Sequence, residues 1–205
     1  MSIPKTHYFE ARPVVASRPR TVRLVIGDLK LDFQADRGVF GSKGVDLGTI
    51  VLLKEAPPPP RAGELLDLGC GYGPIAITLA RRSPDAKIWA VDVNERALEL
   101  TRVNAEASGT NKVTAAKPED VPAATRFDAI YSNPPVRVGK APLHALLMEW
   151  LPRLKPEGAA FLVVQRNLGS DSLAAWLVDQ GFSIARLKSK KGYRVLEVRP
   201  GSSEG

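Results

Sequence analysis

The stretch that decides the fold is "LLDLGCGYGPIAITLA", Leu65 to Ala80. It begins with apolar residues typical of a buried strand, passes through three alternating glycines, and continues with the apolar spacing of a helix. Pro74 suits the first turn of that helix, because its φ angle is already set and its missing N–H would have no partner there. A glycine-rich turn between a strand and a helix lets a ligand approach the backbone closely, so the stretch predicts a cofactor site.

The spacing of the glycines narrows the choice of cofactor. Nicotinamide and flavin sites read G-x-G-x-x-G, but the third glycine would fall at position 74, where the chain has Pro74. The sequence therefore disfavours a dinucleotide. The next strand ends in "WAVDVNERAL" and places Asp92 at its carboxyl end, where a carboxylate can accept hydrogen bonds from ribose hydroxyls. The alternative role for Asp92 is the N-cap of the following helix, for which Asn94 is better placed.

Strands and helices alternate from Gly63 onward. The expected strands are "ELLDLG", "AKIWAVDV", "KVTAA", "FDAIYSNPP", "AAFLVVQ", "FSIARLK" and "YRVLEVR", and the expected helices are "PIAITLARRS", "NERALELTRVNAEASG", "APLHALLMEWLPRL" and "DSLAAWLVDQG". Such alternation predicts a mainly parallel sheet. The last two strands lie too close in sequence for a crossover helix, so they predict an antiparallel hairpin. The predicted fold class is α/β, a doubly wound, seven-stranded, mainly parallel sheet with a C-terminal antiparallel hairpin.

Four consecutive prolines, Pro57 to Pro60, divide the chain. Before them, alternating apolar residues around Gly27 and Asp28 predict a β-hairpin, and "DLGTIVLLKEA" predicts a short helix capped by Asp46 or Thr49. We therefore expect residues 1–60 to form an extension that packs on the main domain. Residues 61–200 form that domain, and residues 201–205 are expected to be a disordered tail.

Composition is that of an ordinary globular protein, with 44% apolar and 25% charged residues among 205. A single cysteine, Cys70, excludes an intramolecular disulfide and a cysteine-based metal cluster. The absence of a bilayer-length apolar run or signal-peptide pattern predicts a cytoplasmic protein. The net charge of +7 is compatible with a polyanionic partner. "RLKSKKGYR", residues 186–194, is either an RNA phosphate contact or a solvated hairpin turn.

The fourth strand ends in "SNPPVRVG". Two prolines fix the turn after Asn133, and by themselves they indicate only a rigid turn. Beside a cofactor loop the motif has a chemical use. The Asn133 side-chain oxygen and the Pro134 carbonyl could each accept an N–H of a planar amine, orient its nitrogen and favour a transition state in which that nitrogen becomes positively charged.

Taken in this order, "LLDLGCGYGPIAITLA", "AVDVNERALEL" and "SNPP" resemble class I S-adenosylmethionine-dependent methyltransferases, which have a Rossmann-like fold. "HYF", "SRPR", "DRGVF", "VDLGT" and "KKGYRV" narrow the resemblance to the small methyltransferase domain of the ribosomal RNA guanine-N2 methyltransferases. The resemblance implies S-adenosylmethionine as cofactor and no metal. It implies these cofactor-binding residues: Asp67, Gly69, Cys70, Gly71, Gly73, Asp92, Val93, either Glu119 or Asp120, and Asn133.

The resemblance also implies a catalytic role for Asn133, Pro134 and Pro135. The fourth position of the motif is usually Tyr or Phe, which stacks on the target, but this chain has Val136. Val136 retains apolar contact with a ring, and Phe40 or Tyr193 could supply the missing stacking. Lys188, Lys190 and Lys191 are the expected RNA contacts.

The predicted function is methyl transfer to an exocyclic amino nitrogen, with guanine N2 of ribosomal RNA as the acceptor and RNA or a ribosomal subunit as the partner. A protein glutamine-amide methyltransferase uses the same Asn-Pro-Pro chemistry and is the first alternative. The second is a non-catalytic RNA-binding module with a vestigial cofactor site. The intact Asp67, Gly69, Gly71, Asp92 and Asn133 argue against this last alternative.

Overall fold

The computed structural model describes residues 15–27 and 29–201. The "HYF" motif at positions 7–9, Asp28 of the N-terminal turn and residues 202–205 of the expected disordered tail lie outside the described residues.

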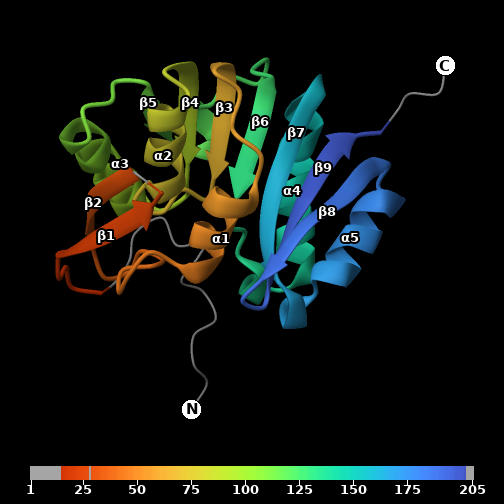
Figure 1. The fold of residues 1–205 in the computed structure, drawn as a ribbon, viewed down its shortest axis with the longest axis horizontal. Helices are drawn as coiled ribbons and strands as arrows, with labels where there is room; N and C mark the ends of the chain where they lie inside the picture. Colours follow the sequence, from red (N-terminus) through yellow and green to blue (C-terminus); the bar gives the residue numbers. More distant parts are fainter. Residues whose placement is uncertain (1–14, 28, 202–205) are drawn as a thin grey trace.

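The centre of the fold is a seven-stranded sheet with strand order β5-β4-β3-β6-β7-β9-β8 (Figure 1). Strands β3 to β7 pair in parallel, and β9 pairs antiparallel with both β7 and β8. The predicted sheet and its terminal hairpin are therefore confirmed. Their bounds are β3 (Ala62–Leu68), β4 (Asp85–Val91), β5 (Val113–Ala116), β6 (Phe127–Ser132), β7 (Leu154–Gln165), β8 (Phe182–Lys190) and β9 (Tyr193–Pro200).

The order of the strands reverses beside β3. After β3 the chain adds β4 and then β5 on one side, and it returns to place β6 on the other side of β3. The connections that leave the carboxyl ends of β3 and β6 therefore diverge. In doubly wound sheets, this divergence opens a crevice in which ligands bind.

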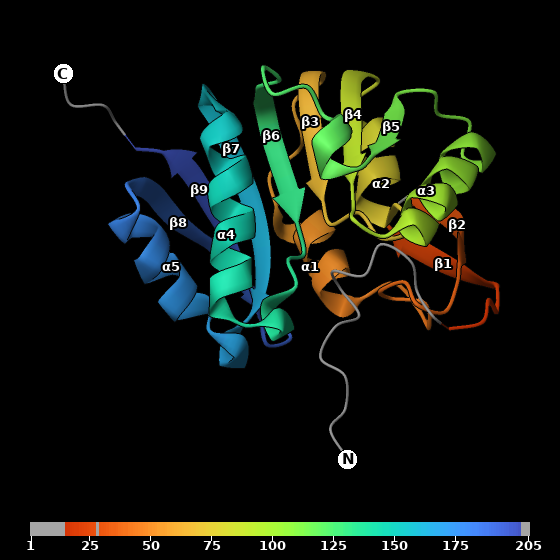
Figure 2. The same ribbon diagram turned by 180° about the vertical axis from the view of Figure 1, so that it is seen from behind.

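Helices cover both faces of the sheet (Figures 1 and 2). One apolar core includes side chains of α1, α2 and α3, and a second core includes side chains of α4 and α5. Successive residues of β3 alternate between them, since Leu65 belongs to the first core and Leu66 to the second. The bounds are α1 (Leu47–Glu55), α2 (Pro74–Arg82), α3 (Glu95–Ala107), α4 (Lys140–Trp150) and α5 (Ser170–Asp179).

The N-terminal segment forms the predicted hairpin, β1 (Arg20–Ile26) with β2 (Leu29–Ala35), as a separate two-stranded sheet. Asn104 of α3 attaches this hairpin to the main domain. Its side chain accepts a hydrogen bond from the Gln34 N–H at 2.7 Å and donates to the Gln34 carbonyl at 2.8 Å, as a neighbouring strand would. Asn104 also donates to the carbonyl of Tyr72, so one buried amide connects the hairpin to the glycine-rich turn.

Two boundaries differ most from the sequence-based expectation. The helix expected to run through Leu154 ends as an α-helix at Trp150 and continues as a 3₁₀ turn, Leu151–Arg153. Pro152 explains the change, because it has no N–H to donate within the helix. Strand β7 begins at Leu154, five residues before the expected Ala159, with a register shift against β6.

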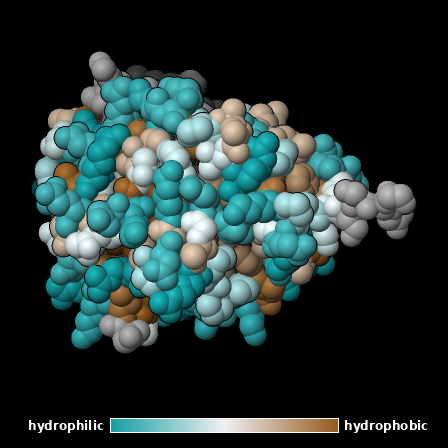
Figure 3. Space-filling model, turned by 90° about the horizontal axis from the view of Figure 1, so that it is seen from above, coloured by the Kyte–Doolittle hydropathy of each residue, from teal (hydrophilic) through white to brown (hydrophobic). Residues whose placement is uncertain are grey.

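The surface seen from above in Figure 1 is mainly hydrophilic, with apolar residues in small, separated groups (Figure 3). Among the residues that the structure describes, no helix is long and apolar enough to span a membrane.

Candidate functional site

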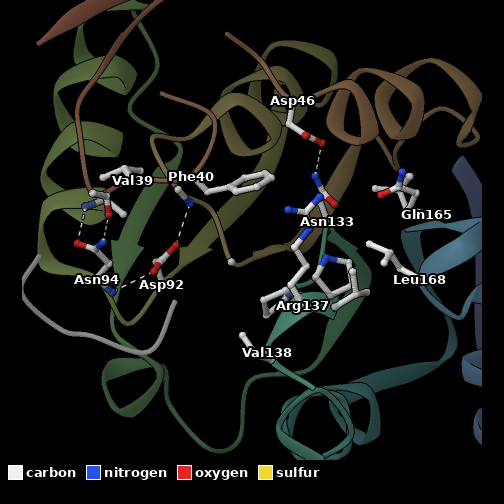
Figure 4. A pocket seen from close by; sticks show the side chains of 18 of the residues that line it. Val39, Phe40, Asp46, Asp92, Asn94, Asn133, Arg137, Val138, Gln165 and Leu168 are labelled. Atoms are coloured by element: carbon white, nitrogen blue, oxygen red, sulfur yellow. Dashed lines mark hydrogen bonds between the residues drawn. The ribbon is translucent and has the colours of Figure 1, made fainter. Parts of the chain in front are cut away.

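A cavity of about 850 Å³ lies at the carboxyl ends of the central strands (Figure 4). Five separate parts of the chain line it, and together they supply both polar and apolar side chains. The lining residues are Val15, Gly38, Val39, Phe40 and Asp46 from the N-terminal segment; Gly69 and Gly71; Asp92, Asn94 and Ala97; Asn133 to Val138; and Val163, Gln165, Leu168 and Tyr193.

One wall of the cavity comes from the N-terminal segment that leads into α1. Asn94 holds this wall, since its side-chain amide donates to the Gly38 carbonyl at 2.9 Å. Arg96 donates to the Arg37 carbonyl at 2.7 Å. The wall presents the ring of Phe40 between Asp92 and Asn133 (Figure 4), and 58% of Phe40 is exposed. An aromatic ring left open to a cavity is suited to stack on another planar group.

The glycine-rich turn and Asp92 form the opposite side. The Asp92 carboxylate accepts hydrogen bonds from the backbone N–H groups of Gly71 and Asn94, both at 2.9 Å. Asn94 caps α3, as expected. Asp92 is therefore fixed by the backbone rather than free, but each carboxylate oxygen retains a second lone pair for a ligand. Gly71 has a φ of +57°, which favours glycine and exposes the backbone at the cavity.

Asp67 is fully buried at the end of β3, behind the cavity. One oxygen accepts from the Ala76 N–H at 2.9 Å, while Oδ1 has no hydrogen-bond partner among the described residues. Burial raises the pKa of Asp67 to about 8, the charge of Asp92 adds to the rise, and the bond from Ala76 opposes it. Burial also raises the pKa of Asp92. Among the described residues, no positive side chain pairs with either carboxyl group, so this side of the cavity suits a cationic ligand.

Asn133 lies at the switch point, directly after β6. Its side-chain amide nitrogen donates to Asp46 Oδ2 at 2.7 Å and to Thr49 Oγ1 at 3.1 Å. None of the described residues donates a hydrogen bond to its oxygen, Oδ1. The half-buried side chain therefore offers a free acceptor atom at the cavity wall.

The two prolines after Asn133 form a tight turn. Pro135 has φ −77° and ψ +66°, the values of an inverse γ-turn, and the Val136 N–H donates to the Pro134 carbonyl at 2.8 Å. The Pro134 carbonyl oxygen thus already accepts one hydrogen bond, and its second lone pair remains free to accept an N–H of a substrate amine.

The structure brings together about half of the expected site residues. Gly69, Gly71, Asp92, Asn133, Pro134, Pro135, Phe40, Val136 and Tyr193 all line the cavity. Cys70 lines a small hollow beside it, and burial raises the pKa of its thiol well above the usual value. The cavity lining does not include Asp67, Gly73, Val93, Glu119 or Asp120, and the last two are exposed on a 3₁₀ turn, Pro118–Asp120. Their roles toward a cofactor stay predictions.

Sequence reasoning missed three polar residues of the cavity. Gln165 ends β7, and the rule that ligands bind at carboxyl strand ends would have found it. Arg137 follows the Asn-Pro-Pro turn and points into the cavity (Figure 4). Asp46 was expected only as a possible helix cap, and nothing local in the sequence connects it with Asn133. Within the described ranges, no three His, Cys, Asp or Glu side chains are grouped to hold a metal ion.

The basic C-terminal hairpin reaches the same edge of the sheet, since Tyr193 at the start of β9 lines the cavity. Some of its charges are already paired. Lys190 contacts Glu55 at 3.0 Å, and Arg186 and Arg194 share Asp171. Lys188 and Lys191 are exposed, and neither has an ion-pair partner among the described residues.

Comparisons with known proteins agree with this geometry. The family model described as methyltransferase small domain matches residues 30–197. The uncharacterized protein YbxB of Bacillus subtilis is 35% identical over 94% of this chain and 98% of its own length. Ribosomal RNA small subunit methyltransferase C of Shewanella pealeana is 35% identical over 67% of this chain but only 41% of its own length.

Among solved structures, the T. thermophilus 16S rRNA N2 G1207 methyltransferase (RsmC) in complex with AdoMet and guanosine superposes with a TM-score of 0.77. It is 28% identical, and the match covers 92% of this chain and 52% of that one. The chain thus spans about half or less of the ribosomal RNA methyltransferases that it matches, and nearly all of YbxB.

Proposed function

The chain belongs to the methyltransferase small domain family, and we propose that it transfers a methyl group from S-adenosylmethionine to an exocyclic amino nitrogen, guanine N2 of ribosomal RNA. One observation carries the proposal. A free acceptor atom, Asn133 Oδ1, lies on the wall of a cavity that also contains a glycine-rich turn and a strand-end carboxylate.

The residues of the cavity fit the cofactor. S-adenosylmethionine carries a sulfonium and an ammonium, and the cavity has two buried carboxyl groups on the side of the glycine-rich turn, Asp67 and Asp92, whose pKa is raised by burial. Asp92 would hold the ribose hydroxyls through its remaining lone pairs, and the exposed backbone of Gly69 and Gly71 would face the methionine part. Asp67, one oxygen of which has no partner among the described residues, lies behind the turn, where a bound cation would favour its ionised form.

The acceptor side follows from Asn133 and the turn after it. The bound cofactor supplies an electrophilic methyl group: the nitrogen lone pair forms the new N–C bond, the C–S bonding pair stays on sulfur, and the nitrogen loses a proton to water. Asn133 Oδ1 and the remaining lone pair of the Pro134 carbonyl would each accept one N–H of the amine. This arrangement orients the amine, and both bonds strengthen as its nitrogen becomes positive.

Three further residues of the cavity support a nucleobase as the acceptor. The exposed ring of Phe40 offers a stacking surface, which compensates for Val136 at the usual aromatic position. Arg137 and Gln165 provide donors and an acceptor that a base edge can use. The relative solved with guanosine binds such a base, and we expect the present chain to meet its RNA in the cytoplasm.

The direct test is transfer of a tritiated methyl group into naked 16S RNA, 23S RNA, small ribosomal subunits and release factors, side by side. The expected result is label in 16S RNA or small subunits that digests to N2-methylguanosine. Label in a release factor would establish the glutamine-amide alternative instead. If no substrate is labelled although calorimetry detects cofactor binding, the proposed acceptor is wrong. A protein that does not bind the cofactor at all would be the non-catalytic module.

A further inference from the structure

We propose that Asp46 is a positioning residue for methyl transfer: it holds the Asn133 side-chain amide in the one orientation that points Oδ1 at the acceptor amine. This inference rests on the proposed function. It assigns Asp46 a role beyond the cap of a helix that lies far from Asn133 in sequence.

The first step is to decide which end of the Asn133 side-chain amide is the oxygen and which is the nitrogen. A side-chain amide can rotate by half a turn and exchange its oxygen and nitrogen. A carboxylate can only accept hydrogen bonds, so the atom of Asn133 that lies 2.7 Å from Asp46 Oδ2 must be the nitrogen. Thr49 Oγ1, at 3.1 Å, takes the second N–H. Both donors of the amide are therefore occupied, and only its oxygen is left for a ligand.

The second step is that Asp46 itself is held firmly. The same oxygen, Oδ2, accepts from the backbone N–H groups of Gly48 at 2.8 Å and Thr49 at 3.3 Å, which makes Asp46 the N-cap of α1. The helix is anchored by Leu52, which is fully buried. The ring of Tyr193 lies so close to Gly48 that a Cβ there would be 2.9 Å from Tyr193 Cε1. The carboxylate therefore has a fixed place from which to direct Asn133.

The third step is the chemical consequence. In the reversed orientation, Asn133 would present its N–H groups to the amine that receives the methyl group. That amine also donates N–H groups, so the two would have no hydrogen bond between them. The bond to a carboxylate also polarises the amide, which places more negative charge on Oδ1 where the nitrogen becomes positive. Asp46 thus acts through Asn133 and contacts neither the acceptor nor the reacting atoms.

Two substitutions separate this role from capping. Serine and asparagine cap helices about as well as aspartate, so D46S and D46N should both retain α1 and the melting temperature. Serine is too short to reach Asn133, whereas asparagine keeps an oxygen of the same reach. We expect kcat to fall about 10- to 100-fold in D46S and less than about fivefold in D46N, with cofactor affinity unchanged in both. The side-chain ¹H–¹⁵N signals of Asn133 should move upfield and lose exchange protection in D46S.

A double-mutant cycle tests whether Asp46 acts through Asn133. In an N133A background, D46S should cause no further loss of kcat, because the amide that it positions is gone. Additive losses would overturn the proposal. Full activity in D46S would also overturn it. Equal losses of kcat in D46S and D46N, together with weaker cofactor binding, would overturn it as well and would make Asp46 a cofactor ligand. If N133A is fully active the proposed function itself fails, whereas an inactive N133A with an active D46S refutes only the present inference.

Discussion

Replacing Asp67 with asparagine should stabilise the protein by an amount that increases with pH. Burial raises the pKa of Asp67 from the ordinary 3.8 to about 8 in the folded chain. Between these two values the folded state keeps a proton that the unfolded state has lost. The free energy of unfolding must therefore fall as the pH rises through this window, and it becomes level above pH 8. Asparagine does not titrate, so D67N removes this fall.

The magnitude follows from the size of the shift. One pKa unit corresponds to about 1.4 kcal/mol, and the full shift sets an upper bound of roughly 5–6 kcal/mol. Between pH 5 and pH 8 we expect a change on the order of 2–4 kcal/mol in the stability difference between D67N and the parent. At pH 5 the folded parent keeps its carboxyl neutral, so the advantage of the variant should be smallest there. Its amide still accepts the Ala76 N–H but leaves its own N–H groups without a partner.

Urea unfolding, followed by tryptophan fluorescence and far-UV circular dichroism from pH 5 to pH 9, measures the effect. D179N is the matched control, because it removes the same charge from an exposed position at the end of α5. Its difference from the parent should vary little across this range. If the curves of D67N and the parent run parallel from pH 5 to pH 9, Asp67 is ionised in the folded protein and the reasoning is refuted.

Three further predictions concern the cavity and the hairpin. D92A should weaken cofactor binding about 10- to 100-fold by calorimetry with a native circular dichroism spectrum, and unchanged affinity would remove Asp92 from the site. N133A should lower kcat by about 10²–10³ in single-turnover assays at saturating cofactor, with little change in cofactor affinity, whereas full activity would reduce the motif to a turn. Lys191 has a φ of +50° beside Gly192, a conformation that asparagine tolerates better, so K191N should raise the melting temperature slightly. Because the substitution also removes a positive charge, it should weaken RNA binding and flatten its salt dependence, and unaltered RNA binding would make the hairpin a solvated turn.

The sheet and the glycine-rich turn could be predicted because their signals are local. Alternating strand and helix patterns determine a mainly parallel sheet, and the short connection before Tyr193 determines the final hairpin. The same locality explains why Asp92 and Asn133 could be placed at one edge, since both follow parallel strands directly. Where a proline interrupts a helix pattern, as at Pro152, the element type was correct and only its end was misplaced.

Charges were harder to predict than elements. Residues 186–194 contain five positive side chains, and nothing in the sequence alone indicates that any of them is paired with an acid. In the folded chain, Glu55 of α1 and Asp171 of α5 neutralise part of this cluster. These acids are distant in sequence, so only the packing of α1 and α5 beside the hairpin reveals them. Lys188 and Lys191 remain the better candidates for phosphate contacts, and Lys190 is the weaker one.

The N-terminal segment shows most clearly what a linear reading cannot give. Four prolines separate it from the sheet, and its division at residue 60 as an extension stays a prediction. Yet Asp46 holds Asn133, Asn94 holds the Gly38 carbonyl, and Asn104 bonds both the hairpin and the turn at Tyr72. Each contact joins positions tens of residues apart through a side-chain amide, which is common in sequences and carries no periodic signal. Because each of these amides donates a hydrogen bond to a distant part of the chain, a shift of the segment would leave polar groups without their partners, and the bond from Asn94 to Gly38 holds the cavity wall that carries Phe40.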